Sequence, residues 1–122
     1  MTETNKHRVV VLSLWAEDVP ATAHFYKDVL GLEFFSHHHG DRPHFKVGDD
    51  YLTILQGKPR PAEDAEPFPL FALEVANLDV ALSKLHAHGV STPNGIQIGS
   101  RSRYIMFDDP AGNIIELVQF EN

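Results

Sequence analysis

Hydrophobic and polar positions follow the same order in the two halves of the chain. The apolar runs Val9–Trp15 and Leu70–Val75 each predict a strand. Each run is followed by a helical pattern in which apolar residues recur every three or four positions, at Ala21, Phe25 and Val29 and then at Leu78, Ala81, Leu82 and Leu85. The repetition of this order predicts a duplicated unit.

Residues suited to helix ends flank both helical patterns. Asp18 and Asn77 precede them, and their side-chain oxygens are typical N-cap acceptors for the first-turn N–H groups. Gly31 and Gly89 follow them, as expected of residues that end a helix in the left-handed conformation. A shift of 59 residues places Val11 on Leu70, Asp18 on Asn77 and Asp50 on Asp109.

Three strand-like segments follow each predicted helix. They are residues 32–37, 43–47 and 51–56 in the first half, and residues 95–98, 103–107 and 113–120 in the second. The prolines and charges of residues 58–67 predict an extended linker. We therefore expect one α+β domain over residues 1–122, made of two βαβββ modules (8–57 and 68–121).

Composition excludes several classes of protein. The net charge of −7 argues against a nucleic-acid binder, since such proteins concentrate Lys and Arg. No apolar run approaches the ~20 residues of a membrane-spanning helix, and the first eight residues are too polar for a signal peptide. The chain has no cysteine and hence no disulfide or thiolate site. We expect an acidic cytoplasmic protein that binds neither nucleic acid nor membrane.

Two segments resemble one known family. Residues 18–32 contain Phe-Tyr and Leu-Gly-Leu, and residues 108–117 contain Asp-Pro-Ala-Gly-Asn-Ile-Ile-Glu-Leu. Both resemble the vicinal oxygen chelate superfamily, which includes glyoxalase I, bleomycin-resistance proteins and extradiol dioxygenases. The resemblance implies that each module curls its sheet into an open cup and that paired cups enclose one binding cavity. Many members hold a divalent metal there with four ligands, two from each module.

The resemblance places the four ligand positions at Val11, Thr53, Leu70 and Glu116. Val and Leu offer no lone pair and Thr is a poor ligand, so Glu116 alone is of a ligand type. We therefore expect no metal cofactor at these positions. An alternative divalent site (Mn, Zn, Ni or Fe) at His37 and His44 stays open, although the run His37–His39 reads better as a polar loop.

Strand alternation predicts which residues line the cavity. The expected lining residues are Val11, Ser13, Trp15, Tyr51, Thr53, Leu55, Leu70, Ala72, Glu74, Ile114, Glu116 and Val118. This apolar and aromatic surface with two carboxylates suits an aromatic or cationic small molecule. Glu116 is either a remnant of the family pattern or a functional group, which anchors the ligand or acts as a general base.

Three functions are compatible with the sequence. The first is a metal-independent small-molecule binder of the bleomycin-resistance type. The second is an enzyme (lyase, isomerase or dioxygenase) that uses unconventional metal ligands or Glu116 as base. The third is an interaction module whose cavity is filled by Trp15, Phe45 and Tyr104. All three predict a homodimer, because unpaired cups leave edge strands and apolar faces exposed.

Overall fold

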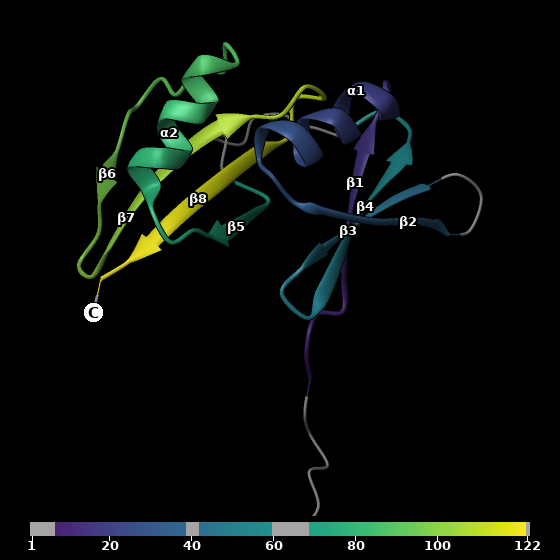
Figure 1. Cartoon of the computed structure of the whole chain (residues 1–122), viewed down its shortest axis with the longest axis horizontal. Coiled ribbons are helices and arrows are strands. Elements are labelled where there is room, and N and C mark those ends of the chain that lie inside the picture. The colour runs from purple at the N-terminus through teal and green to yellow at the C-terminus, as the bar shows by residue number, and fades with distance from the viewer. Residues whose placement is uncertain (1–6, 39–41, 60–68, 122) are drawn as a thin grey trace, which may run out of the picture.

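The computed structural model describes residues 7–38, 42–59 and 69–121, which form two four-stranded sheets with helices packed on them (Figure 1). The elements of the first half are β1 (Val11–Ala16), α1 (Val19–His24), the π-helical turn η1 (Phe25–Val29), β2 (Glu33–His38), β3 (Arg42–Val47) and β4 (Asp50–Gln56). Those of the second half are β5 (Phe71–Glu74), α2 (Leu78–Ala87), β6 (Gln97–Ile98), β7 (Ser102–Asp108) and β8 (Ile114–Phe120). The strand orders are β1-β4-β3-β2 and β5-β8-β7-β6. The predicted α+β fold of two βαβββ units is confirmed.

The two sheets have matching registers. The first strand of each half pairs in parallel with the last, so that Ser13 lies opposite Thr53 and Ala72 opposite Glu116. Ser13 and Ala72 differ by the predicted 59 positions, whereas Thr53 and Glu116 differ by 63. Thr53 therefore occupies in the first sheet the position that Glu116 occupies in the second.

The difference between the shifts of 59 and 63 positions corrects one correspondence that the sequence predicted between the two halves. Asp50 precedes Thr53 by three positions, and Asn113 precedes Glu116 by three. Asp50 therefore corresponds to Asn113 and not to Asp109, as the single shift of 59 predicted. The second half has gained four residues before its last strand, which a uniform shift does not accommodate.

Both helical segments begin and end as predicted. Asp18 and Asn77 are N-caps, and the side chain of each accepts a hydrogen bond of 3.0 Å from the backbone N–H three residues further on. Gly31 and Gly89 have φ angles of 76° and 77°, which a residue with a Cβ adopts only with strain. These glycines end the helical segments in the left-handed conformation.

The first helical segment contains an irregularity that periodicity did not predict. It has one residue more between N-cap and terminal glycine than the second, and η1 absorbs this residue through a bond of 3.0 Å from Leu30 N–H to Phe25 C=O. In the preceding turn Thr22 is buried and Ala21 is exposed. The prediction that Ala21 belongs to the apolar face is therefore wrong.

Side chains from both halves form one hydrophobic core. The ring centroids of Phe25 in η1 and Phe107 in β7 lie 6.0 Å apart, which joins the first helix to the second sheet. In β1 the core side chains are Leu14 and Ala16, and in β5 the core side chain is Leu73. The alternate residues of these strands lie on the opposite sheet faces.

Some predicted features lie outside the described residues. These are His39, Gly40 and Asp41 of the polar loop and residues 60–67 of the linker. Within the described ranges, every helix is too short or too polar to cross a bilayer.

Candidate functional site

Each sheet has one face that carries no helix, and these faces hold the residues predicted to line a cavity. The first open face comprises Val11, Ser13, Trp15, Tyr51, Thr53 and Leu55, on β1 and β4. The second open face comprises Leu70, Ala72, Glu74, Ile114, Glu116 and Val118, on and beside β5 and β8. Val11, Trp15 and Leu70 are 44%, 47% and 57% exposed, so both faces present apolar side chains to solvent.

The first open face is aromatic and bears a cationic group, Lys46. The ring of Tyr51 lies 5.1 Å from the ring of Phe35, and Lys46 Nζ lies 5.5 Å from the centroid of Tyr51. Cross-strand pairing places His44 beside Thr53 and Lys46 beside Tyr51. The face therefore combines π surfaces with a positive charge.

The second open face is acidic and carries smaller side chains around its central carboxylate. Glu116 lies between Ala72 on β5 and Met106 on β7. Partial burial raises the pKa of the Glu116 carboxyl above its usual range, because desolvation penalises the charged form. Glu74 adds a second, exposed carboxylate.

The residues at the four metal-ligand positions do not fit a divalent ion. Val11 and Leu70 carry hydrocarbon side chains, and the buried Thr53 hydroxyl donates a hydrogen bond of 2.9 Å to Pro43 C=O. One carboxylate, Glu116, remains at these positions, whereas bound divalent ions take several strong protein ligands. Among the described residues, no three His, Asp or Glu side chains gather into a metal-binding group.

The alternative histidine site stays a hypothesis. In the β2–β3 ladder His37 pairs with Pro43, whereas His44 pairs with Ser36. His44 Nδ1 lies 3.0 Å from Arg42 C=O, so one ring nitrogen is engaged with the backbone.

Phe45 does not belong to either open face. It is fully buried beneath the helices, with its ring 6.4 Å from that of Tyr26. The hypothesis of a cavity filled by Trp15, Phe45 and Tyr104 is therefore wrong for Phe45. Successive strand residues alternate between faces, and Phe45 follows the open-face residue His44.

Asp109 joins the two halves through a buried hydrogen-bond network that the sequence analysis missed. Its carboxylate accepts bonds from Tyr26 Oη (2.6 Å), Ala111 N–H (2.9 Å), and the backbone and side-chain N–H groups of Asn113 (2.9 and 3.0 Å). Asn113 Nδ2 also donates to Trp15 C=O at 3.2 Å. Figure 1 shows this β7–β8 turn beside α1.

Burial and the same network together raise the pKa of the Tyr26 phenol. Burial raises the pKa of its phenol far above the usual range, and the Asp109 charge and hydrogen bond raise it further. The Pro, Gly and Asn residues of the segment Asp109–Asn113 are typical of a tight turn but do not indicate a buried network. Its partner Tyr26 is 83 positions away, so spacing alone did not reveal the pair.

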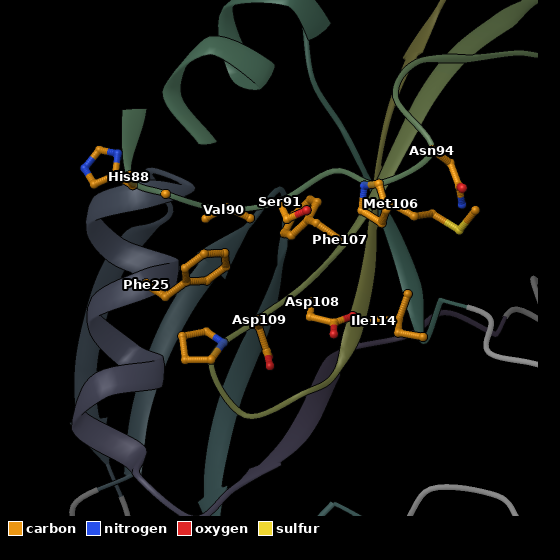
Figure 2. Close-up of a pocket in the computed structure, with 13 residues that line it drawn as sticks. Phe25, His88, Val90, Ser91, Asn94, Met106, Phe107, Asp108, Asp109 and Ile114 are labelled. Carbon is orange, nitrogen blue, oxygen red and sulfur yellow. The ribbon is translucent and has the colours of Figure 1, made fainter. Parts of the chain in front are cut away.

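Two cavities lie largely apart from the open faces. One has a volume of about 630 Å³ and is bounded by η1, the loop after α2 and the β7–β8 turn; Figure 2 shows Phe25 and Val90 at one end and Asn94 and Met106 at the other. The other, about 470 Å³, lies between residues 29–33 and 46–48 of the first module and residues of the second module, and it is lined by both Lys46 and Glu74. Of the predicted lining residues, Ile114 lines the first cavity and Glu74 the second.

Comparison with solved structures finds the same fold in several proteins. The antibiotic-binding protein TnmS3 from a Streptomyces species has a TM-score of 0.80 at 23% identity, with 98% of this chain and 100% of that chain covered. Lactoylglutathione lyase from Agrobacterium tumefaciens has a TM-score of 0.73 at 21% identity, with 95% and 96% covered. A glyoxalase/bleomycin resistance protein/dioxygenase from Alicyclobacillus acidocaldarius has a TM-score of 0.72 at 17% identity, with 98% and 96% covered.

Sequence comparison identifies the family directly. No curated protein matches the chain. The family model of the Glyoxalase/Bleomycin resistance protein/Dioxygenase superfamily matches residues 8–117. This range includes both motifs and all but the last four residues of the two modules, so the chain belongs to the Glyoxalase/Bleomycin resistance protein/Dioxygenase superfamily.

Proposed function

We propose that this protein binds a small aromatic or cationic organic molecule without using a metal. The residues at the four ligand positions carry the proposal, because three of them lack a donor suited to a divalent ion. Binding of a small organic molecule is compatible with this fold, since TnmS3 is an antibiotic-binding protein of similar structure. The fold alone does not decide between binding and catalysis, because function depends on the site.

The chemistry of the open faces supports this class of ligand. On the first face Trp15, Tyr51 and Phe35 offer aromatic surface for packing. On the second face Glu74 and Glu116 offer carboxylates that would attract a cationic group. A ligand held between the two faces would contact both.

We infer that the two faces meet in a homodimer. Exposed apolar residues lie on both faces, and contiguous surfaces of this kind mark interaction sites. The cationic Lys46 on the first face complements the anionic Glu74 on the second. A second copy that places its second face against the first face would cover both patches and close a cavity between them.

A second candidate function is metal-independent catalysis with Glu116 as general base. The observation that favours it is the raised pKa of the Glu116 carboxyl, because a base works best when its pKa approaches the working pH. Incubation of any bound ligand with wild type and Glu116→Gln, followed by NMR of the ligand, tests this function. Conversion by wild type alone would support catalysis, and unchanged ligand in both samples would support binding.

The first experiment on the main proposal measures metal content. Untagged protein is analysed for bound metal, and its melting temperature is recorded with EDTA and with added Mn²⁺, Zn²⁺, Ni²⁺ and Fe²⁺. We expect substoichiometric metal and unchanged melting. Near-stoichiometric metal together with a melting shift of several degrees would overturn the metal-independent proposal.

The proposed homodimer is tested by light scattering on the same sample, which measures whether the particle has twice the 13.7 kDa chain mass.

A further inference from the structure

Trp15 rests on a glycine that the backbone does not require. A Cβ atom at Gly57 would lie 2.3 Å from Cε3 and 2.7 Å from Cζ3 of the Trp15 ring. Such distances are far below van der Waals contact, so the indole occupies the space of a side chain at position 57. The φ angle of Gly57 lies outside the left-handed region, so other residues could adopt this backbone conformation. The absence of a side chain at Gly57 therefore makes room for the indole ring of Trp15.

Hydrogen bonds hold the backbone on both sides of this contact. Gly57 N–H donates to Ala16 C=O at 3.0 Å, which continues the pairing of β4 with β1. Asn113 Nδ2 donates to Trp15 C=O at 3.2 Å, and Asn113 is itself bonded to the buried Asp109. The backbone that carries the indole is therefore held in place before any ligand binds, which reduces the entropy lost on binding.

The indole is also accessible. Trp15 is 47% exposed, and it makes no ring–ring contact with any other aromatic residue in the described ranges. It lies on the first open face with Val11 and Tyr51, so a molecule bound there would approach it from solvent. One side of the ring thus meets Gly57 while much of the remainder stays uncovered.

We propose that the Trp15 indole, seated on Gly57, is a stacking platform for a planar, π-conjugated ring of the ligand. The inference rests on the proposed binding function and narrows its ligand class from aromatic or cationic molecules to flat conjugated rings. A fixed indole face favours offset stacking and attracts electron-poor or cationic rings in particular. A saturated ring of equal charge lacks the π surface and binds less well.

The test uses the fluorescence of the one tryptophan in the chain. The probe is 1-methylnicotinamide, a planar pyridinium cation, and the matched control is 1,1-dimethylpiperidinium, a saturated ring of the same charge. We expect 1-methylnicotinamide to quench the emission saturably and to produce a charge-transfer absorption band. Binding of the piperidinium, measured by calorimetry, is expected to be at least fivefold weaker.

Substitutions test whether Gly57 affects ligand binding by positioning the indole ring of Trp15. Gly57→Ala is expected to weaken 1-methylnicotinamide binding at least fivefold by displacing the indole, while circular dichroism confirms that the variant is folded. In a Trp15→Leu background, measured by calorimetry, the same substitution is expected to have no further effect. If Gly57→Ala fails to fold, NMR of the wild type replaces this test. The ring current of the indole is expected to shift the Gly57 Hα resonances of the wild type upfield relative to those of Trp15→Leu.

Four outcomes would overturn the proposal that the Trp15 indole is a stacking platform. They are equal affinity for the planar and saturated rings, calorimetric binding without quenching, a Gly57→Ala effect that persists without Trp15, and unshifted Gly57 Hα resonances. Equal affinity or binding without quenching would leave the proposed binding function standing, because a ligand would still occupy the protein. Absence of heat with both rings and with a broader panel of aromatic cations would count against both proposals.

Discussion

The two halves of this protein share a core and differ on their open faces. Phe45 pairs with Leu52 in the first sheet, as Phe107 pairs with Ile115 in the second, and all four side chains are buried beneath helices. On the opposite faces the corresponding positions hold Thr53 and Glu116, His44 and Met106, and Trp15 and Glu74. The core positions thus hold apolar residues in both halves, while the open-face positions differ in chemistry between the halves.

This difference indicates which constraints act on each surface. Side chains in a close-packed core tolerate little change of volume or polarity, because cavities and buried polar groups cost stability. The open faces carry no such packing requirement, so their residues follow whatever covers or binds them. The aromatic, cationic first face and the acidic second face are therefore the surfaces on which function is to be sought.

The turns before the last strands differ as well. In the second half Asp109 accepts four hydrogen bonds and is buried. In the first half, Asp50 pairs with Arg8 at 3.5 Å, and the two side chains are 37% and 68% exposed. The second turn therefore links the halves, whereas the first acts locally.

The largest expected effect comes from breaking this link. Asp109→Ala leaves the Tyr26 hydroxyl and the N–H groups of Ala111 and Asn113 without their acceptor. Each buried unsatisfied group costs about 1–3 kcal/mol, so we expect the free energy of unfolding to fall by about 4 kcal/mol in urea denaturation. Asp50→Ala, which removes a partly exposed carboxylate paired with Arg8, is the control and is expected to cost less than about 1 kcal/mol. Equal losses in the two variants would contradict the difference between the turns.

Removing one bond of the link gives a smaller effect. Tyr26→Phe deletes the donor to Asp109 and is expected to lower the free energy of unfolding by about 2 kcal/mol, since hydrogen bonds to charged groups are the stronger ones. Tyr104→Phe, on the second sheet, is the control and should change it by less than about 0.5 kcal/mol. Chemical denaturation at pH 7 measures both.

The raised pKa of Tyr26 adds a pH dependence. The unfolded phenol ionises near its usual pKa of about 10, whereas the folded phenol stays protonated to higher pH because of burial and the nearby Asp109. Its contribution to stability is fully present below pH ~10 and is lost as the pH rises further. We expect wild type to lose more stability than Tyr26→Phe in this range, and parallel curves would refute the assignment.

The proposed pairing of the faces predicts a charge effect on association. Lys46→Glu makes the first open face acidic like the second and is expected to raise the dimer dissociation constant about tenfold, which corresponds to about 1.4 kcal/mol. Glu74→Lys in the same chain should restore association. Lys58→Glu, an exposed residue after β4, is the control. Sedimentation measures all three, and an unchanged constant in Lys46→Glu would count against this arrangement.

The smallest effect concerns Glu116. Burial raises the pKa of its carboxyl in the folded state, so its contribution to stability is present at low pH and is lost as the pH rises above the unfolded pKa. Glu116→Gln cannot ionise, and we expect its melting temperature to rise relative to wild type between pH 4 and pH 7. Glu74→Gln controls for the loss of a surface charge. A constant difference between Glu116→Gln and wild type would show that burial of the carboxylate carries no penalty.

Much of the fold was predictable because local rules act on neighbouring residues. Asp18 and Asn77 cap helices, and Gly31 and Gly89 end them, through interactions that span a few positions. Strand alternation likewise separated the core residue Leu14 from the open-face residue Trp15. The repeat of the order of elements then predicted two similar units.

Other features depended on partners that are distant in sequence. A uniform shift matched Asp50 with Asp109, because the ladder that sets the true register joins strands of one sheet and is not visible in spacing. The extra residue in the first helix produced η1, which changed the side chains that pack on the core.

The sequence by itself determined the family, the duplicated α+β fold and the residue types at the positions where the family resemblance places metal ligands. Only the tertiary structure decided that Asp109 joins the halves through Tyr26, and that Gly57 makes room for the indole of Trp15. The physical reason is the separation along the chain of the residues that interact. Caps and alternation operate within one element, whereas a buried hydrogen bond or a ring seated on a glycine forms only when separate elements are brought together.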